Sequence, residues 1–167
     1  GLARDTLESQ GDEPRLWALN ALANAAEGLA TVGLEDEARD AMRAVIAGVP
    51  EHFGDPHVYD LGIRASALLP TSEAVKALLT LRDAAAAREP TLRAPALASV
   101  AAALHKLGHE ESRACLREAF LASRLAGHEG FLTVLTRCAS LLGVLDGGKT
   151  LREVNACLAE VKTWWQS

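Results

Sequence analysis

The sequence predicts an all-α fold, a right-handed α-solenoid of about four antiparallel helix pairs. Composition is the first reason, because alanine and leucine, two strong helix formers, fill 59 of the 167 positions. Only 4% of the residues are aromatic, whereas a sandwich or barrel favours aromatic and β-branched residues in alternation. The second reason is that apolar residues recur at helical spacing between short connections. The third is an internal similarity between two of the predicted hairpins.

The first hairpin is expected over about residues 14–50. Apolar residues between 19 and 29 follow an i, i+3, i+7 and i+10 pattern, and Gly33 ends this first helix. The second helix starts with three acidic residues, 35–37, which the helix dipole favours at an N-terminus. Pro50 closes the hairpin.

Three further hairpins complete the prediction of a single helical-repeat domain. The domain spans residues 1–167, with the further hairpins over about 54–89, 91–127 and 128–167. Thr71 and Ser72 are candidate N-caps within the second hairpin. The helices of these hairpins are traced by apolar residues within 58–68, 74–85, 97–107, 116–120, 132–142 and 150–165.

Two segments of the chain are similar to each other. Residues 33–43 match residues 107–117 at an offset of 74, which is about two hairpins of 37 residues. A period of this length is typical of helix-pair solenoids, because one hairpin cannot bury its apolar stripe alone. Stacked neighbours supply the missing core.

The first hairpin resembles a tetratricopeptide repeat (TPR). Gly33 stands at the turn, Ala38 is the small residue of the second helix, and Pro50 is the closing proline. The hairpin departs from the family pattern at Leu22, where the family has Trp, and at residues 25–26, where it has Leu-Gly. The later hairpins fit less well, and a HEAT-like stack is the related alternative. The resemblance implies a superhelix that acts in protein–protein interaction.

The last third of the chain resembles the C-terminal end of helical-repeat regions in bacterial STAND signalling ATPases, relatives of NACHT and NB-ARC proteins. The resemblance lies in residues 141–148 and 160–165, the latter with a Val-x-x-Trp-Trp ending. It implies that the chain is the repeat region of a larger protein and that it senses a ligand or partner. The ATPase core itself is not in this sequence.

Charge and hydropathy set the expected partners and location. A formal net charge of −5 and a pI near 5.5 leave no basic field for nucleic-acid phosphates. No run of 18 apolar residues occurs, and the first residues lack the charged-then-apolar plan of a signal peptide. We expect a cytoplasmic protein that binds a protein or peptide, with neither nucleic acid nor membrane as a partner. Its oligomeric state stays open.

Residues 143–150 match the phosphate-binding pattern G-x-x-x-x-G-K-[ST]. A working P-loop needs a preceding strand and a parallel sheet, and the chain shows no βαβ pattern. Thr150 and Glu153 also form a capping box that opens an apolar helix, which explains the segment as a helix stop and restart. A nucleotide-binding enzyme that uses Gly143 to Thr150 stays an alternative function, as does a helical bundle that binds a small apolar ligand.

The remaining reactive side chains favour structural roles. The three cysteines lack C-x-x-C spacing and stand where small apolar residues would, so we expect reduced, buried thiols. They are Cys115, Cys138 and Cys157. His105 and His109 have i, i+4 spacing, but Gly108 breaks the helix between them and no third metal ligand follows at a telling distance. We therefore expect no metal, no cofactor and no catalytic residue.

The predicted function is non-covalent: a preformed concave surface, lined by one helix of each hairpin, accepts a peptide or another domain. Polar residues that interrupt the apolar first helices are candidates for this surface. One of two adjacent tryptophans at the C-terminal end should also be exposed, since helix neighbours point about 100° apart, and Trp17 raises the same question. The candidate partner-binding residues are Asn20, Asn24, Arg64, His105, Arg137, Trp164 and Trp165.

Overall fold

The computed structural model describes residues 12–49, 56–145, 147–149, 152 and 156, and its regular structure within these residues is helical throughout. The all-α prediction is confirmed for this part of the chain. Among the described helices, none is both long enough and apolar enough to cross a membrane. The helices are α2 (Asp12–Thr31), α3 (Glu35–Gly48), α4 (Pro56–Ser66), α5 (Thr71–Ala86), α6 (Pro90–Lys106) and α7 (Glu111–Leu145).

The long helix α7 is divided at Gly127. This glycine has φ 81° and ψ −169°, which are not helical angles. The predicted boundary between two helices at Gly127 is therefore confirmed. Residues 111–126 and 128–145 are called the first and second segments of α7 below.

In two of the helix pairs, the same kind of glycine turn joins the first helix to the second. Gly33 follows α2 with φ 84° and Gly108 follows α6 with φ 70°, values that glycine adopts without a Cβ clash. In each turn a backbone N–H reaches back to the last turn of the helix, as in a Schellman motif. These bonds, both of 3.0 Å, run from Leu34 N–H to Leu29 O and from His109 N–H to Leu104 O. The similarity between residues 33–43 and 107–117 thus includes a shared turn.

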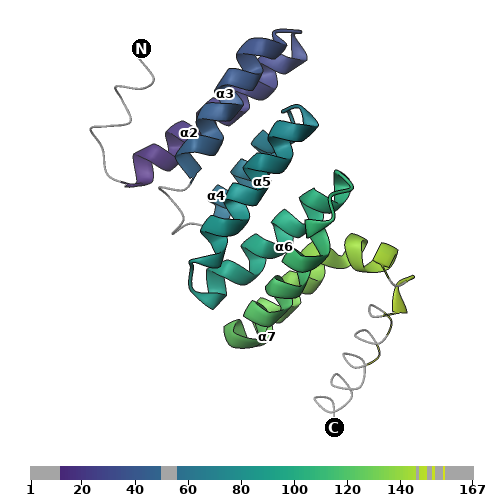
Figure 1. The fold of residues 1–167 in the computed structure, drawn as a ribbon. Helices are drawn as coiled ribbons and strands as arrows, with labels where there is room; N and C mark the ends of the chain where they lie inside the picture. Colours follow the sequence, from purple (N-terminus) through teal and green to yellow (C-terminus); the bar gives the residue numbers. More distant parts are fainter. Residues whose placement is uncertain (1–11, 50–55, 146, 150–151, 153–155, 157–167) are drawn as a thin grey trace.

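The helices pack in chain order. Each helix from α2 to α7 contacts the next one, and α2 also packs on α4, as α4 does on α6. Figure 1 shows the pairs as successive layers, from α2 and α3 through α4 and α5 to α6 and α7. The first helices of the pairs therefore form a continuous row, which positions the candidate site described below.

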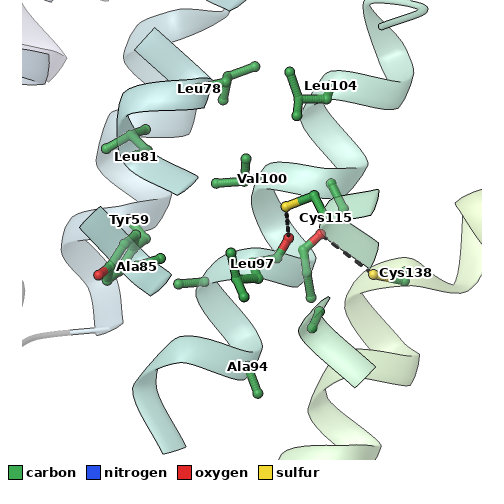
Figure 2. Close-up of a cluster of buried hydrophobic side chains, with 14 of the residues drawn as sticks. Tyr59, Leu78, Leu81, Ala85, Ala94, Leu97, Val100, Leu104, Cys115 and Cys138 are labelled. Atoms are coloured by element: carbon green, nitrogen blue, oxygen red, sulfur yellow. Dashed lines mark hydrogen bonds between the residues drawn. The ribbon is translucent and has the colours of Figure 1, made fainter. Parts of the chain in front are cut away.

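The centre of the buried core is α6. Its buried side chains point to several sides of the helix, as expected for a helix enclosed by neighbours. They are Ala94, Ala96, Leu97, Ala98, Val100, Ala101 and Leu104. Figure 2 shows α6 between Leu78 and Leu81 of α5 on one side and Cys115 and Cys138 of α7 on the other. The many alanines leave room for these neighbours to approach.

The predicted caps of α5 are wrong. Thr71 is the first residue of the helix, and Pro70 holds the N-cap position without a side-chain hydrogen bond. The Pro70 carbonyl accepts the first backbone bonds of the helix, from the N–H groups of Glu73 and Ala74, both over 2.9 Å. Ser72 is likewise inside the helix and exposed.

The start of α6 also differs from the sequence prediction, in which the apolar pattern of this helix began at Leu97. The helix begins at Pro90 and includes Pro95. Pro90 suits its position at the start of the helix, where the first N–H groups have no partner within the helix, whereas Pro95 lies beyond the first turn. The second helix of the fourth predicted hairpin, residues 150–165, falls outside the described residues except at Arg152 and Ala156.

Candidate interaction face

Five of the seven predicted partner-binding residues lie on the row of first helices, and one of them, His105, is in the last turn of α6. Asn20 and Asn24 are one turn apart on α2, Arg64 is on α4, and Arg137 is on the second segment of α7. The two predicted tryptophans, Trp164 and Trp165, lie outside the described residues.

Arg64 connects α4 to α2. Its Nη2 and Nε donate to Glu27 Oε1 over 2.8 and 3.1 Å, and Nη2 also donates to Asn24 Oδ1 over 3.3 Å. The Arg64 side chain is 46% exposed, and ion pairs this exposed contribute about 1 kcal/mol or less to stability. Their main effect is to fix the guanidinium and to neutralise its charge.

Arg137 connects the second segment of α7 to both α4 and α6. Its Nη1 donates to Asp60 Oδ1 over 2.7 Å and its Nη2 to Asp60 Oδ2 over 3.4 Å. Nη1 also donates to Ser99 Oγ on α6. Because this side chain is only 30% exposed, its forked contact is held more firmly than that of Arg64.

The two arginines reach back along the chain by nearly the same number of residues. Arg64 pairs with Glu27 across 37 residues, and Arg137 bonds Ser99 across 38 residues. Both separations match the hairpin period of about 37 residues read from the sequence. Each contact joins one of the first helices to the first helix that precedes it along the row.

An open groove lies at the α2 end of this row. It has a volume of about 350 Å³ and is lined by Leu16, Trp17 and Asn20 of α2 and by Asp60, Leu61 and Arg64 of α4. Trp17 is 77% exposed. The groove and the contacts above make up one surface, called the polar face below. Its residues are Trp17, Asn20, Asn24, Glu27, Asp60, Arg64, Ser99 and Arg137.

Sequence reasoning missed Glu27, Asp60 and Ser99 as members of the polar face. It also left Trp17 outside the list of candidates. The sequence contained an indication for Asp60 and Trp17. Asp60 lies one turn before Arg64, and Trp17 lies away from the apolar stripe of its helix. Only the packing of α2, α4, α6 and α7 could show which acid pairs with which arginine.

His105 does not join the polar face. It lies in the last turn of α6, six residues after Ser99, and six residues turn a helix by about 240°. The nearby His109 has a local contact, because its Nδ1 accepts the backbone N–H of Glu111 over 3.4 Å. The two histidines thus stand on either side of the Gly108 turn rather than on one helical face.

A second row of ion pairs joins the other helices. Arg43 of α3 donates to Glu73 of α5 over 2.8 Å, and Arg82 of α5 donates to Glu111 of α7 over 3.0 Å. The hydrogen bond from Arg43 lowers the pKa of the Glu73 carboxyl. Asp83 beside Arg82 raises the pKa of that guanidinium. These pairs are partly or largely exposed, so they link the helices without adding much stability.

The two described cysteines are buried and free, as predicted. The thiol of Cys115 donates to Leu97 O over 3.2 Å, and that of Cys138 to Ala98 O over 3.5 Å (Figure 2). Burial raises the pKa of each thiol to about 12. A buried thiol that keeps its proton is a poor nucleophile. Cys157 lies outside the described residues.

The P-loop-like segment begins inside a helix. Gly143, Val144 and Leu145 are the last residues of α7. Gly147 and Gly148 follow with φ of 63° and 76°, and the guanidinium of Arg152 donates to Gly147 O over 3.1 Å. A P-loop follows a strand, whereas the residues described before this segment form a helix. Asp146 and Thr150 lie outside the described residues.

The polar face combines neutral polar groups, one exposed aromatic ring and paired charges. It offers amides, one hydroxyl, an exposed indole and two arginine–carboxylate pairs. Comparison of the chain with protein-family models, with curated proteins and with solved structures finds no match.

Proposed function

We propose that the chain is a non-enzymatic interaction or sensor module whose polar face holds a segment of a partner protein. The observation that carries this proposal is the continuity of the face. Side chains from α2, α4, α6 and α7 bond one another across helices, beside an open groove. Side chains fixed in this way lose little conformational freedom on binding, so less binding energy is spent on ordering them.

The architecture we infer behind this face is a right-handed α-solenoid of about four helix pairs, TPR-like or HEAT-like. Support comes from the packing of α2 on α4 and of α4 on α6. The repeated glycine turn and the contacts across 37 and 38 residues add to it. In such a stack the first helices of successive pairs line one surface, where elongated partners bind.

The charges of the polar face favour a protein partner over nucleic acid. Each of its two arginines is already paired with a carboxylate, Arg64 with Glu27 and Arg137 with Asp60. The face therefore carries no excess positive charge for a phosphate backbone. As the sensor region of a bacterial STAND-type signalling protein in the cytoplasm, the chain would receive a protein signal at this face.

A peptide selection followed by mapping tests the proposal. A display library is selected against the full chain, and hydrogen exchange of backbone amides is measured with and without a selected peptide. We expect slower exchange in α2 and α4, where the peptide limits opening of the helices. A scrambled peptide is the control. Protection confined to α3 and α5, or a selection that enriches no sequence, would contradict the proposal.

A further inference from the structure

We infer that the groove between α2 and α4 is the anchor site of the polar face, and that it takes one large apolar side chain from an uncharged segment of the partner. This inference rests on the proposed function and names the chemistry that the face recognises. Three features of the groove support it: its exposed indole, the state of its charged residues and its size.

The exposed indole is the first feature. Trp17 is 77% exposed, more than any other large apolar side chain in the described residues. Tryptophan is highly buried on average, because its large apolar surface gains much from leaving water. Leu16 and Leu61 line the same groove. Leu61 is already buried, so an apolar side chain placed in the groove would remove from water chiefly the Trp17 indole and the remaining exposed surface of Leu16.

The charged residues of the groove are the second feature. Arg64 and Asp60 line it, yet each is held by an opposite charge on another helix. Arg64 is bound by Glu27 of α2, and Asp60 by Arg137 of α7, with shortest distances of 2.8 and 2.7 Å. A charged partner residue would have to compete with these pairs. A neutral one leaves them intact.

The dimensions and free polar groups are the third feature. A volume of about 350 Å³ is near the lower limit for a complete small-molecule site, about 300 Å³, and is enough for one large side chain. Asn20 lines the groove and is exposed, and its amide makes no hydrogen bond within the described part of the chain. An amide both donates and accepts, so it can bond the backbone beside an anchor residue.

The test uses capped pentapeptides, acetyl-Ser-Gly-X-Gly-Ser-amide, in which X is Phe, Leu, Glu or Arg. They are titrated into the ¹⁵N-labelled full chain, and NMR follows the Trp17 indole and the Asn20 side-chain amide. We expect the Phe and Leu peptides to shift these resonances with dissociation constants at least about ten-fold lower than those of the Glu and Arg peptides. Their affinity should change by less than about two-fold between low and high salt, since no charge pairing is involved.

Trp17→Ala should weaken binding of the Phe peptide at least about ten-fold, the cost of losing a central aromatic anchor. Leu125→Ala is the matched control, because Leu125 is 73% exposed but lies on the first segment of α7. It should leave the affinity unchanged. Both residues are largely exposed, so both variants should fold, which circular dichroism verifies.

The inference is overturned if the Glu or Arg peptide binds best, if affinity falls steeply with salt, or if no pentapeptide shifts the two resonances. Equal losses in Trp17→Ala and Leu125→Ala would overturn it as well. Its failure is distinguishable from failure of the proposed function. If a selected peptide still protects α2 and α4 from exchange but ignores Trp17→Ala, the interaction face stands and the anchor site does not.

Discussion

The two ends of the polar face are built differently. At the α7 end, Arg137 is mostly covered and bonds to α4 and α6, above a core in which two thiols contact the backbone of α6. At the α2 end, Arg64 is half exposed and Trp17 stands beside an open groove. The covered end stabilises the array, and the open end keeps apolar surface available. Stability and recognition are thus expected to depend on different residues.

The largest expected effect is a loss of stability at the covered end. Leu104→Ala should lower the free energy of unfolding by about 4 kcal/mol, because the enclosed site in α6 cannot collapse around the cavity. Leu19→Ala at the open end should cost less, about 2 to 3 kcal/mol, because α2 has fewer neighbours that hold the cavity open. Urea unfolding followed by circular dichroism measures both. A larger loss for Leu19→Ala would reverse the assignment of the two ends.

A pH effect also belongs to the covered end. Burial raises the pKa of the Cys115 and Cys138 thiols from 9.0 to about 12. The unfolded chain therefore loses these protons at lower pH than the folded chain, and stability should fall as pH rises from about 9 towards 12. A Cys115→Ala/Cys138→Ala variant should show a shallower fall. Burial also raises the pKa of Tyr59 from 10.0 to about 12, so part of the slope remains. An unchanged slope in the variant would argue against buried thiols.

Substitution of the two arginines of the polar face should reveal a smaller difference in stability between its two ends. Arg137→Ala should cost about 1 to 2 kcal/mol of unfolding free energy, because it removes bonds to two helices from a partly covered site. Arg64→Ala should cost less than about 1 kcal/mol, the usual limit for an exposed pair. Chemical denaturation of the two variants under the same conditions measures the difference. Equal losses of unfolding free energy would show that the two arginines contribute equally to stability, against the difference between the two ends.

The smallest effect on stability is expected at the groove itself. Trp17→Ala should change the free energy of unfolding by less than about 0.5 kcal/mol, since the indole is largely exposed. Thermal unfolding of the variant beside the wild type is the measurement. A loss of several degrees in the midpoint would mean that Trp17 stabilises the fold rather than serving a partner.

The sequence predicted the helices well where periodicity and glycine agreed. Gly33 and Gly127 marked two helix boundaries correctly. A residue with a positive φ interrupts a helix, and glycine is the residue that adopts such a φ most readily. The caps at Thr71 and Ser72 failed because both residues lie inside the helix, and the N-cap position falls on Pro70, whose side chain cannot accept a hydrogen bond. The start at Pro90 was missed because its first turns carry few large apolar residues.

The candidate site was predicted in part. Polar residues within apolar helices indicated Asn20, Asn24, Arg64 and Arg137, and the structure brings these onto the row of first helices. The same criterion also selected His105, which points elsewhere, because an interruption in an apolar stripe does not specify which neighbour it faces. Pairing partners far apart in the chain, such as Asp60 for Arg137 across 77 residues, depend on how helices stack. Local spacing does not encode that.

One matched pair of variants tests most directly whether recognition belongs to the polar face. Arg64 and Arg43 have similar exposure, 46% and 48%, and each pairs with a glutamate of another helix at 2.8 Å. Only Arg64 lies on the polar face. Arg64→Glu and Arg43→Glu therefore change the net charge equally, and each breaks an ion pair with a glutamate of another helix, with Arg43→Glu also breaking the pair with Asp40.

The measurement is the affinity of one selected peptide for both variants by calorimetry at the same salt concentration. We expect Arg64→Glu to weaken binding at least about ten-fold, because a carboxylate without a cationic partner then lines the apolar groove. Arg43→Glu should stay within about two-fold of the wild type. An equal or larger loss in Arg43→Glu, or no loss in Arg64→Glu, would place recognition elsewhere on the molecule.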